Sequence, residues 1–396
     1  MKNLRKLLIL VLLTVAFGVN AQSDTTIYFV NIYPGSAIYE LEGHSGIIVD
    51  KGDGRPIAYN FGVFDFDAPN FVYRFVKGET DYMAVAYPAD AFLYPYQRAR
   101  RRIVAHELNL DGSQKHSLIE ALNRHILPQN RTYRYNYVLD NCATRPLRMV
   151  EEALGDTILF ATSPTGYRSS FRNVMRHYHA HYPWYQFGID IALGSGIDRP
   201  LSGREVSFAP VELAAMLDSA TVGGAPLAKG AQVWLDVPGD AAVEGPTPWP
   251  LRPITVCWAV FALAALLTFA DLRRGHPSRW FDSLYFGIIG LTGCLSAFLI
   301  FISVHEATSP NYLFAWLNPF ALFPAVAVWI KSAKKAVVWY QIINFAVLIA
   351  LVGLWPLLPQ SANPAFLPLV LAELLRSGLY ITLSNRTLAP EKGNKR

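Results

Sequence analysis

The chain has 396 residues, of which 52% are apolar and only 16% are charged. Soluble globular proteins carry about 25% charged residues, so this composition favours a protein with a membrane-embedded part. Three cysteines exclude a disulfide-rich scaffold. The net charge of +5 could suggest nucleic acid, but many basic residues lie in short loops between apolar segments, where they set membrane topology. We therefore expect no nucleic acid partner.

The N-terminus has the features of a secretory signal peptide. Three basic residues among the first six precede an apolar stretch over residues 7–17, and small residues around Ala21 suit signal peptidase. We place a signal peptide at residues 1–21, which would export the domain that follows. An uncleaved anchor helix is the alternative.

Residues 22–235 are mixed polar and apolar and are predicted to form an extracytoplasmic α+β domain. Alternating β-branched and aromatic residues predict short strands, and leucines at helical spacing predict helices. The predicted strands are 26–33, 45–50, 56–61, 82–87 and 102–108, and the predicted helices are 113–126 and 143–154. A small antiparallel sheet with helices fits this order.

A Pro/Gly-rich linker over residues 236–252 separates this domain from an apolar region over 253–383. That region contains five apolar segments of roughly 18 to 21 residues, and each is long enough to cross a hydrocarbon core as a helix. The five predicted spans are 253–270, 284–304, 312–330, 337–355 and 365–383. The sequence therefore predicts an all-α, five-span membrane domain.

Lysine and arginine lie in alternate loops of this membrane domain. They occur in the first and third connecting loops and in the tail over residues 384–396, but not in the second and fourth loops. Basic loops face the cytoplasm, so we expect a multi-pass inner-membrane protein with a cytoplasmic C-terminus. Five spans then place the N-terminal domain in the periplasm, in agreement with the signal peptide.

Cys142 is the single cysteine of the predicted outer domain, because Cys257 and Cys294 lie in predicted spans. A lone thiol in an oxidising compartment is either buried or useful. Cys142 follows Asp140 and Asn141, which are good N-cap residues, and precedes a helical stretch. A thiol on a first helical turn would have a lowered pKa and would favour the nucleophilic thiolate. Pro146 leaves open a later helix start, near Thr144.

His44 is the histidine best placed to act as the base. It lies at the mouth of a predicted strand, between Gly43 and Gly46, where an imidazole can face a cleft. The third member of a Cys/His site orients the imidazole through its other nitrogen. Asn60 on the next strand could fill that role, with Tyr59 as the competing choice.

The sequence HYHAH at residues 177–181 is the one candidate for a metal site. Its spacing places only the outer two histidines on one helical face, and no acidic or cysteine ligands accompany it. We therefore expect neither a metal nor another cofactor.

Six motifs in order along the chain resemble the Lnb-type bacterial lipoprotein N-acyltransferases. They are GHSGIIVD, AYNFGVFDFDAPNFVYRFVKGETDY, YRYNYVLDNCATRP, FGIDIALGSGIDRP, VSFAP and SVHEATSPNYLFAWLNP. The resemblance extends from about residue 26 to the last span. It implies a circularly permuted papain-like fold with His before Cys, and acyl transfer through a thioester on Cys142 with His44 as base.

Such an enzyme would take an acyl chain from a membrane phospholipid and transfer it to the N-terminal diacylglyceryl-cysteine of a lipoprotein. Both substrates stay in the bilayer, which explains a membrane domain. The alternative is a membrane-tethered papain-like hydrolase, either a phospholipase or a cell-wall peptidase or amidase. A noncatalytic scaffold with a buried Cys142 is a third possibility.

Several polar residues are candidates for substrate contacts: Tyr59, Asn141, Arg145, His305 and Asn311. Arg145 could meet a lipid phosphate or lie on a solvated surface. His305 and Asn311 lie in the second membrane loop, where substrate binding and structural hydrogen bonding are equally open. Glu373 and Arg376, at i and i+3 in the fifth span, are expected to pair with each other.

Overall fold

The computed structural model describes residues 25–161 and 164–388. The chain forms two compact units. Within the described residues, unit 1 comprises residues 25–64, 81–161 and 203–242, and unit 2 comprises residues 65–80, 164–202 and 243–388. The signal peptide predicted at residues 1–21 and the last eight residues of the predicted tail lie outside the described residues. Unit 2 therefore takes two segments from the range assigned above to the outer domain.

Unit 1 is built on a seven-stranded antiparallel sheet with the order β6-β4-β3-β2-β1-β5-β9. All five predicted strands are present, and β6 and β9 are additions at the two edges. The strands are β1 (Thr26–Ile32), β2 (His44–Asp50), β3 (Ile57–Val63), β4 (Asp81–Pro88), β5 (Ile103–Leu108), β6 (Thr132–Arg134) and β9 (Ala228–Leu235). A separate hairpin joins β7 (Thr221–Val222) and β8 (Ala225–Pro226).

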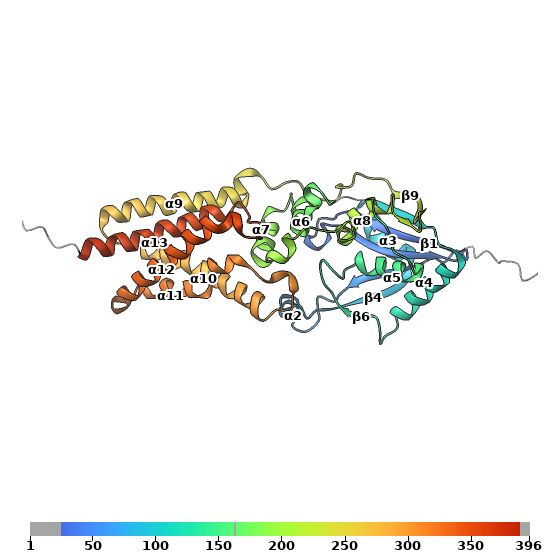
Figure 1. The fold of residues 1–396 in the computed structure, drawn as a ribbon, viewed down its shortest axis with the longest axis horizontal. Helices are drawn as coiled ribbons and strands as arrows, with labels where there is room; N and C mark the ends of the chain where they lie inside the picture. The colour runs from blue at the N-terminus through green and yellow to red at the C-terminus, as the bar shows by residue number, and fades with distance from the viewer. Residues whose placement is uncertain (1–24, 162–163, 389–396) are drawn as a thin grey trace, which may run out of the picture. The chain divides into compact units, whose positions relative to one another are not determined.

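Side chains alternate between the two faces of this sheet and build a core on each face. Helices α4 (Gly112–His125), α5 (Thr144–Leu154) and α8 (Pro210–Leu217) supply buried leucines to one core. Helix α3 (Ala89–Arg98) covers the other face through Ala89 and Phe92. Figure 1 shows these helices around the strands of unit 1. The observed α+β architecture agrees with the sequence.

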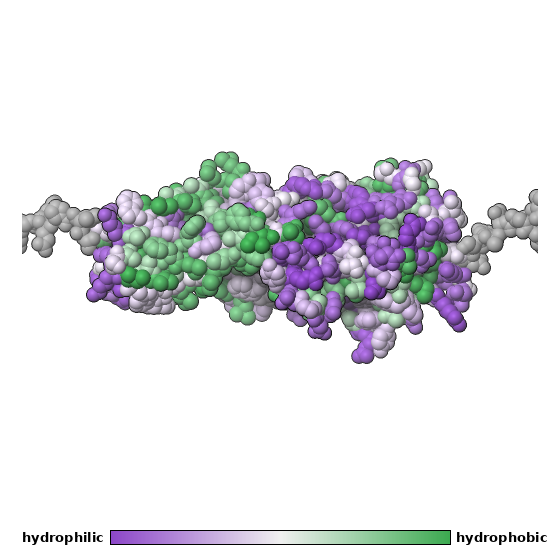
Figure 2. All heavy atoms as spheres, turned by 90° about the horizontal axis from the view of Figure 1, so that it is seen from below, coloured by the Kyte–Doolittle hydropathy of each residue, from purple (hydrophilic) through white to green (hydrophobic). Residues whose placement is uncertain are grey.

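Unit 2 is helical. Helix α13 packs along α9 and α12, and α10 packs against α11. The helices are α2 (Phe71–Lys77), α6 (Phe171–Tyr178), α7 (Pro183–Ala192), α9 (Pro253–Arg274), α10 (Arg279–Phe301), α11 (Leu322–Ala327), α12 (Lys334–Leu354) and α13 (Phe366–Leu388). Apolar side chains cover much of the visible surface of the bundle (Figure 2), as expected of helices that face lipid.

Among the described residues, four helices are long and apolar enough to cross a membrane. The third predicted span, over 312–330, is not one of these four helices. Residues 312–327 form an apolar helical segment that is too short and is interrupted near Asn318 and Pro319. Proline has no backbone N–H and favours a helix start, which explains the break. The expected continuous helix over 312–330 is wrong, and the five-span count stays a prediction.

The expected pairing of Glu373 with Arg376 is also wrong. Arg376 is fully buried and forms ion pairs with Asp271 at 2.9 Å and Asp282 at 2.6 Å. Glu373 instead accepts a hydrogen bond of 2.8 Å from Trp316. Helical spacing identified these residues as neighbours on α13, but their partners come from other helices of the bundle.

Candidate functional site

Cys142 lies in the turn before α5, and Asn141 fixes that turn. The Asn141 Oδ1 accepts hydrogen bonds from the backbone amides of Ala143 at 2.9 Å and Thr144 at 3.0 Å. Helix α5 begins at Thr144, as the position of Pro146 suggested. Cys142 therefore precedes the first helical turn, and Asn141, a candidate for substrate contact, is the residue that holds it there.

The thiol of Cys142 is buried, with 8% of the residue exposed. Burial raises the pKa of Cys142 to about 11, although hydrogen bonds from the Ser45 amide, the Tyr135 hydroxyl and its own amide act in the opposite direction. Glu42 raises the pKa further through its charge. The expectation of a lowered thiol pKa is therefore wrong, because loss of solvation outweighs the backbone dipoles.

The contact with Ser45 brings Cys142 to the start of β2, where His44 is the neighbouring residue. The end of β3 approaches from the other side. A Cβ built on Gly62 would lie 3.6 Å from the Cys142 Cβ and 3.3 Å from the Tyr135 ring. Gly62 has a φ of +82° and lies within a register shift between β3 and β4. The missing side chain and the bulge leave room for the thiol turn.

His44 and Asn60 form the hydrogen bond expected of an oriented base. The distance from His44 Nε2 to Asn60 Oδ1 is 2.7 Å. An amide oxygen only accepts, so Nε2 carries the proton and Nδ1 of the neutral ring keeps a lone pair. Asn60 is fixed in turn, because its Nδ2 donates to the Tyr87 hydroxyl at 2.8 Å. The imidazole can therefore accept a proton at Nδ1.

The imidazole of His44 is packed against aromatic rings. Its centroid lies 6.2 Å from that of Phe92 and 6.0 Å from that of Tyr96, both on α3. Burial lowers the pKa of His44 to about 4, an effect that the hydrogen bond to Asn60 opposes and the charge of Arg101 reinforces. At neutral pH, both the thiol and the imidazole are therefore uncharged.

Strand geometry separates Asn60 from Tyr59. Successive side chains on a strand point to opposite faces, so the two residues cannot both reach His44. Asn60 lies on the α3 face with His44, whereas Tyr59 belongs to the opposite core and donates to Asn123 of α4 at 2.7 Å. The structure therefore brings Asn60, rather than Tyr59, to the imidazole.

Arg145 is held by its own unit. It forms an ion pair with Asp140, and its guanidinium lies 3.6 Å from the centroid of the Tyr133 ring. Both contacts fix the side chain beside the turn that carries Cys142. A contact of Arg145 with lipid phosphate stays a prediction.

His305 and Asn311 belong to unit 2 and bind its backbone. His305 Nε2 lies 2.9 Å from the Phe75 carbonyl oxygen, and Asn311 Nδ2 donates to the Ile191 carbonyl at 2.8 Å. These contacts hold the loop between α10 and α11 against other segments of the same unit. Their proposed contacts with substrate stay predictions.

The histidines of residues 177–181 point to separate partners. His179 Nδ1 lies 2.7 Å from the Gln186 side chain, His181 Nδ1 lies 2.8 Å from the Glu244 carbonyl, and His177 stacks on Tyr167. Within residues 25–161 and 164–388, no group of three His, Cys, Asp or Glu residues is arranged to hold a metal ion.

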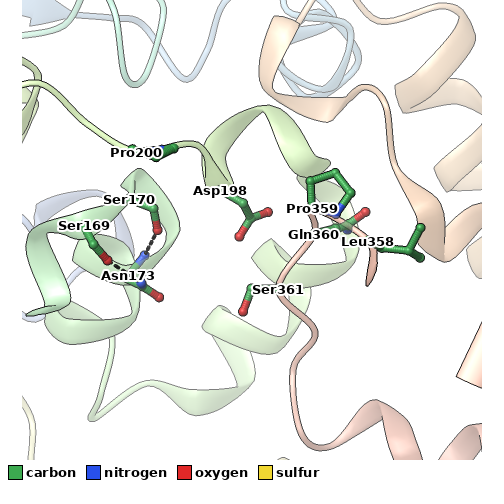
Figure 3. Close-up of a pocket in the computed structure, with 9 residues that line it drawn as sticks. All are labelled: Ser169, Ser170, Asn173, Asp198, Pro200, Leu358, Pro359, Gln360 and Ser361. Atoms are coloured by element: carbon green, nitrogen blue, oxygen red, sulfur yellow. Dashed lines mark hydrogen bonds between the residues drawn. The ribbon is translucent and has the colours of Figure 1, made fainter. Parts of the chain in front are cut away.

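Unit 2 also contains an open polar pocket of about 350 Å³ (Figure 3). On one wall, Asn173 Nδ2 donates a hydrogen bond of 3.0 Å to Ser169 Oγ. On another wall, Asp198 Oδ1 accepts a hydrogen bond of 2.8 Å from Arg172 Nε. The pocket is lined by Ser169, Ser170, Asn173, Asp198, Pro200, Leu358, Pro359, Gln360 and Ser361. None of the residues named from the sequence as substrate contacts lines it.

Sequence reasoning missed Tyr135 and Ser45, which contact the thiol directly. Tyr135 lies in an irregular segment, where no periodicity indicates the direction of a side chain. Ser45 acts through its backbone amide, which its side-chain chemistry cannot reveal. For Ser45, the sequence offered one signal, which was its position at the start of the strand predicted over residues 45–50.

Comparison with known families assigns both parts of the chain. The Lnb N-terminal periplasmic domain matches residues 18–174, and the Lnb transmembrane domain matches residues 246–388. The chain belongs to the Lnb family. No curated protein and no solved structure gives a significant match.

Membership in the Lnb family agrees with the architecture. The chain is an inner-membrane protein with a periplasmic N-terminal domain, and it resembles a lipoprotein N-acyltransferase. The α+β sheet of unit 1 lies within the periplasmic part, and the apolar helices of unit 2 form the membrane part. The thiol site described above belongs to the periplasmic domain.

Proposed function

We propose that this Lnb-family protein moves a fatty acyl chain from a membrane phospholipid to the α-amino group of a diacylglyceryl-cysteine at the N-terminus of a lipoprotein. The observation that carries the proposal is a buried thiol that binds the Ser45 amide, next in the chain to the His44 imidazole that Asn60 orients. Cysteine is the proposed nucleophile, His44 the base and Asn60 the positioning residue.

In the first half-reaction, the Cys142 sulfur attacks the ester carbonyl carbon of the phospholipid while its proton passes to His44 Nδ1. Collapse of the tetrahedral intermediate breaks the ester bond, and His44 returns the proton to the departing lysophospholipid alkoxide. Because both groups start uncharged, attack and proton transfer are coupled. The product is a thioester on Cys142.

In the second half-reaction, the unprotonated α-amine of the lipoprotein attacks the thioester carbonyl. His44 accepts a proton from the amine and gives it to the leaving Cys142 sulfur, which restores the neutral pair. The amide product carries the third acyl chain. Burial of the thiol supports transfer over hydrolysis, because a dry site limits attack by water.

Two further elements belong to the proposal. The C-terminus lies in the cytoplasm, which follows from the basic loops and an odd number of spans. The broken helical segment over residues 312–327 would serve as the remaining crossing, with its interrupted backbone covered by neighbouring helices.

The test is mass spectrometry of a lipoprotein N-terminal peptide from cells that lack other N-acylation activity. We expect a third acyl chain with the wild-type protein and none with Cys142→Ala. Cys294→Ala is the matched control, because it removes an exposed thiol from α10, and it should retain the third chain.

A peptide that stays diacylated with a correctly inserted wild-type protein would contradict the acyltransferase proposal. Release of free fatty acid from phospholipid in that experiment would instead identify a phospholipase. Cleavage of cell-wall peptides would identify the peptidase alternative.

A further inference from the structure

Residues 65–80 form an excursion between β3 and β4 that belongs to unit 2 and exposes large apolar side chains. Its helix α2 lies between Asn70 and Gly78, both of which have positive φ values. The exposed fractions are 59% for Phe66, 73% for Val72, 54% for Tyr73 and 49% for Phe75. Four neighbouring apolar side chains of this size are unusual on a surface that faces only water.

The last turn of α2 is fixed to the end of α10. The Lys77 carbonyl accepts a hydrogen bond of 2.9 Å from the Val304 amide, and the Val76 carbonyl accepts one of 3.1 Å from the Ser303 hydroxyl. The last carbonyls of an α-helix extend beyond the amides of that helix, and here the loop after α10 supplies donors to two of them. Figure 1 shows α2 beside this loop.

The apolar surface of α2 continues onto the membrane helix. Tyr73 packs edge-to-face on Phe298 of α10, with ring centroids 6.0 Å apart. Next to this contact, Phe301 is 70% exposed and Val304 is 53% exposed. Helix α10 is long and apolar enough to span a membrane, so its exposed end residues face lipid near the bilayer surface. The exposed side chains of α2 extend the same apolar surface.

Three charged residues at the C-terminal end of this segment bind within it, whereas Asp65 and Asp67 near its start are exposed. Lys77 forms an ion pair with Glu79 at 2.8 Å, and Arg74 donates to the Glu79 carbonyl at 2.9 Å. A seven-residue helix is roughly 10 Å long and cannot cross a bilayer. Helices of this kind rest in the interface with their apolar side toward the acyl chains.

We propose that residues 65–80 form a lipid-contacting surface in the outer leaflet of the inner membrane, with phospholipid acyl chains against Phe66, Val72, Tyr73 and Phe75. Asn60, which orients the base, lies on β3. The segment follows β3 and begins five residues after Asn60. Lipid contact would therefore supply the acyl donor to that end of the periplasmic domain. This role in donor supply rests on the proposed function, whereas the contact with lipid does not.

The experiment uses the full-length protein reconstituted in vesicles that contain a phospholipid with a photoreactive diazirine on one acyl chain. After irradiation, mass spectrometry locates the labelled peptides. Peptides from residues 65–80 should carry at least about fivefold more label than the α3 peptide with Tyr94. Tyr94 is the matched control because it is a similarly exposed aromatic residue, at 57%, in unit 1.

A second measurement uses the double variant Phe66→Ser with Val72→Ser, the two most exposed large apolar side chains of the segment. Acylation of Cys142 from vesicle phospholipid should fall roughly tenfold, because two apolar anchors are lost. Acylation by a water-soluble short-chain ester should stay unchanged, which shows that the variant is folded. The corresponding surface variant Tyr94→Ser should lose neither reaction.

The outcomes separate the two proposals. Equal labelling of the 65–80 and Tyr94 peptides would overturn the lipid surface, even if wild-type Cys142 becomes acylated. Strong labelling of 65–80 without any acyl-enzyme would support the lipid surface and contradict the proposed function. A loss of acylation from both ester substrates in the double variant would mean that the segment acts on folding rather than on lipid, and would overturn its role in donor supply.

Discussion

The thiol site of unit 1 and the helices of unit 2 bury polar side chains in different ways. In unit 2, Arg376 is fully buried between Asp271 and Asp282, and Arg172 is fully buried between Asp190 and Asp198. In unit 1, the thiol of Cys142 and the imidazole of His44 are both uncharged at neutral pH.

The difference separates structural from reactive groups. A buried ion pair holds its charges in place, because removing either partner leaves an uncompensated charge in a medium of low polarity. An uncharged thiol and imidazole carry no buried charge at rest, and charge develops only when the thiol proton passes to the imidazole during attack. Variants at the thiol site should therefore change reactivity, whereas variants of the buried ion pairs should change stability.

The largest effect is expected from His44→Ala. Acyl transfer should fall by about a thousandfold or more, because the variant lacks the proposed acceptor of the thiol proton. Alkylation of Cys142 by iodoacetamide at pH 8 should change little, since a neutral imidazole does not stabilise the thiolate. A parallel collapse of alkylation would indicate a thiolate–imidazolium pair and would break the comparison.

The pH dependence of alkylation tests the neutral pair in the wild-type protein. The pKa of Cys142 is raised to about 11 and that of His44 is lowered to about 4, so both groups are neutral across the range between these values. The thiolate fraction, and with it the alkylation rate, should rise roughly tenfold per pH unit from pH 7 to 10. A rate that is constant from pH 5 to 8 would contradict the neutral pair. Cys142→Ala provides the background rate.

In unit 2, Arg376→Leu should lower the free energy of unfolding by about 3 to 5 kcal/mol, because two carboxylates lose their partner inside the bundle. The triple variant that adds Asp271→Asn and Asp282→Asn should recover part of this loss. Thermal unfolding in detergent measures both variants. If the triple variant is less stable than the single one, hydrogen-bond geometry rather than charge holds the cluster together.

The sequence predicted most of the strands and helices whose apolar residues follow a regular period. The alternating residues of β1 and β2 and the leucines of α4 each belong to one element, so their pattern follows from local geometry. The choice between Asn60 and Tyr59 depended on strand register, which the structure supplied. Unpatterned segments such as α2 gave no comparable signal.

The pKa of the thiol and the ion-pair partners of buried residues were harder to predict from the sequence. Local reasoning placed Cys142 near a helix start and concluded that its pKa is lowered, whereas burial by distant segments raises it. The same limit applied to Arg376, whose partners are about a hundred residues away in the chain. Proximity of distant segments, rather than the residues themselves, was the missing information.

Asn60→Ala should reduce the rate constant of acyl transfer about 30- to 100-fold, since the imidazole loses the partner that fixes its tautomer. The KM for phospholipid should stay within about twofold, as Asn60 contacts the base rather than the substrate. Tyr59→Phe is the control, because Tyr59 lies on the opposite face of the sheet. A change confined to KM would indicate a substrate-binding role for Asn60.

The smallest effect is expected from Tyr135→Phe. The Tyr135 hydroxyl is one of three hydrogen-bond donors to the Cys142 sulfur, and its loss should raise the pKa of the thiol further. A hydrogen bond to a charged group contributes about 1.5 kcal/mol, so alkylation at pH 8 should slow roughly tenfold. The slope of rate against pH should not change, because the pair remains neutral.

Tyr82→Phe serves as the control for Tyr135→Phe, since Tyr82 stacks on the Tyr135 ring at 4.3 Å but is not among the donors to the sulfur. Equal slowing in both variants would assign the effect to packing of the two rings. Slowing in Tyr135→Phe alone would mean that stabilisation of the emerging thiolate depends on uncharged donors, in contrast to the ion pairs that hold the helical bundle.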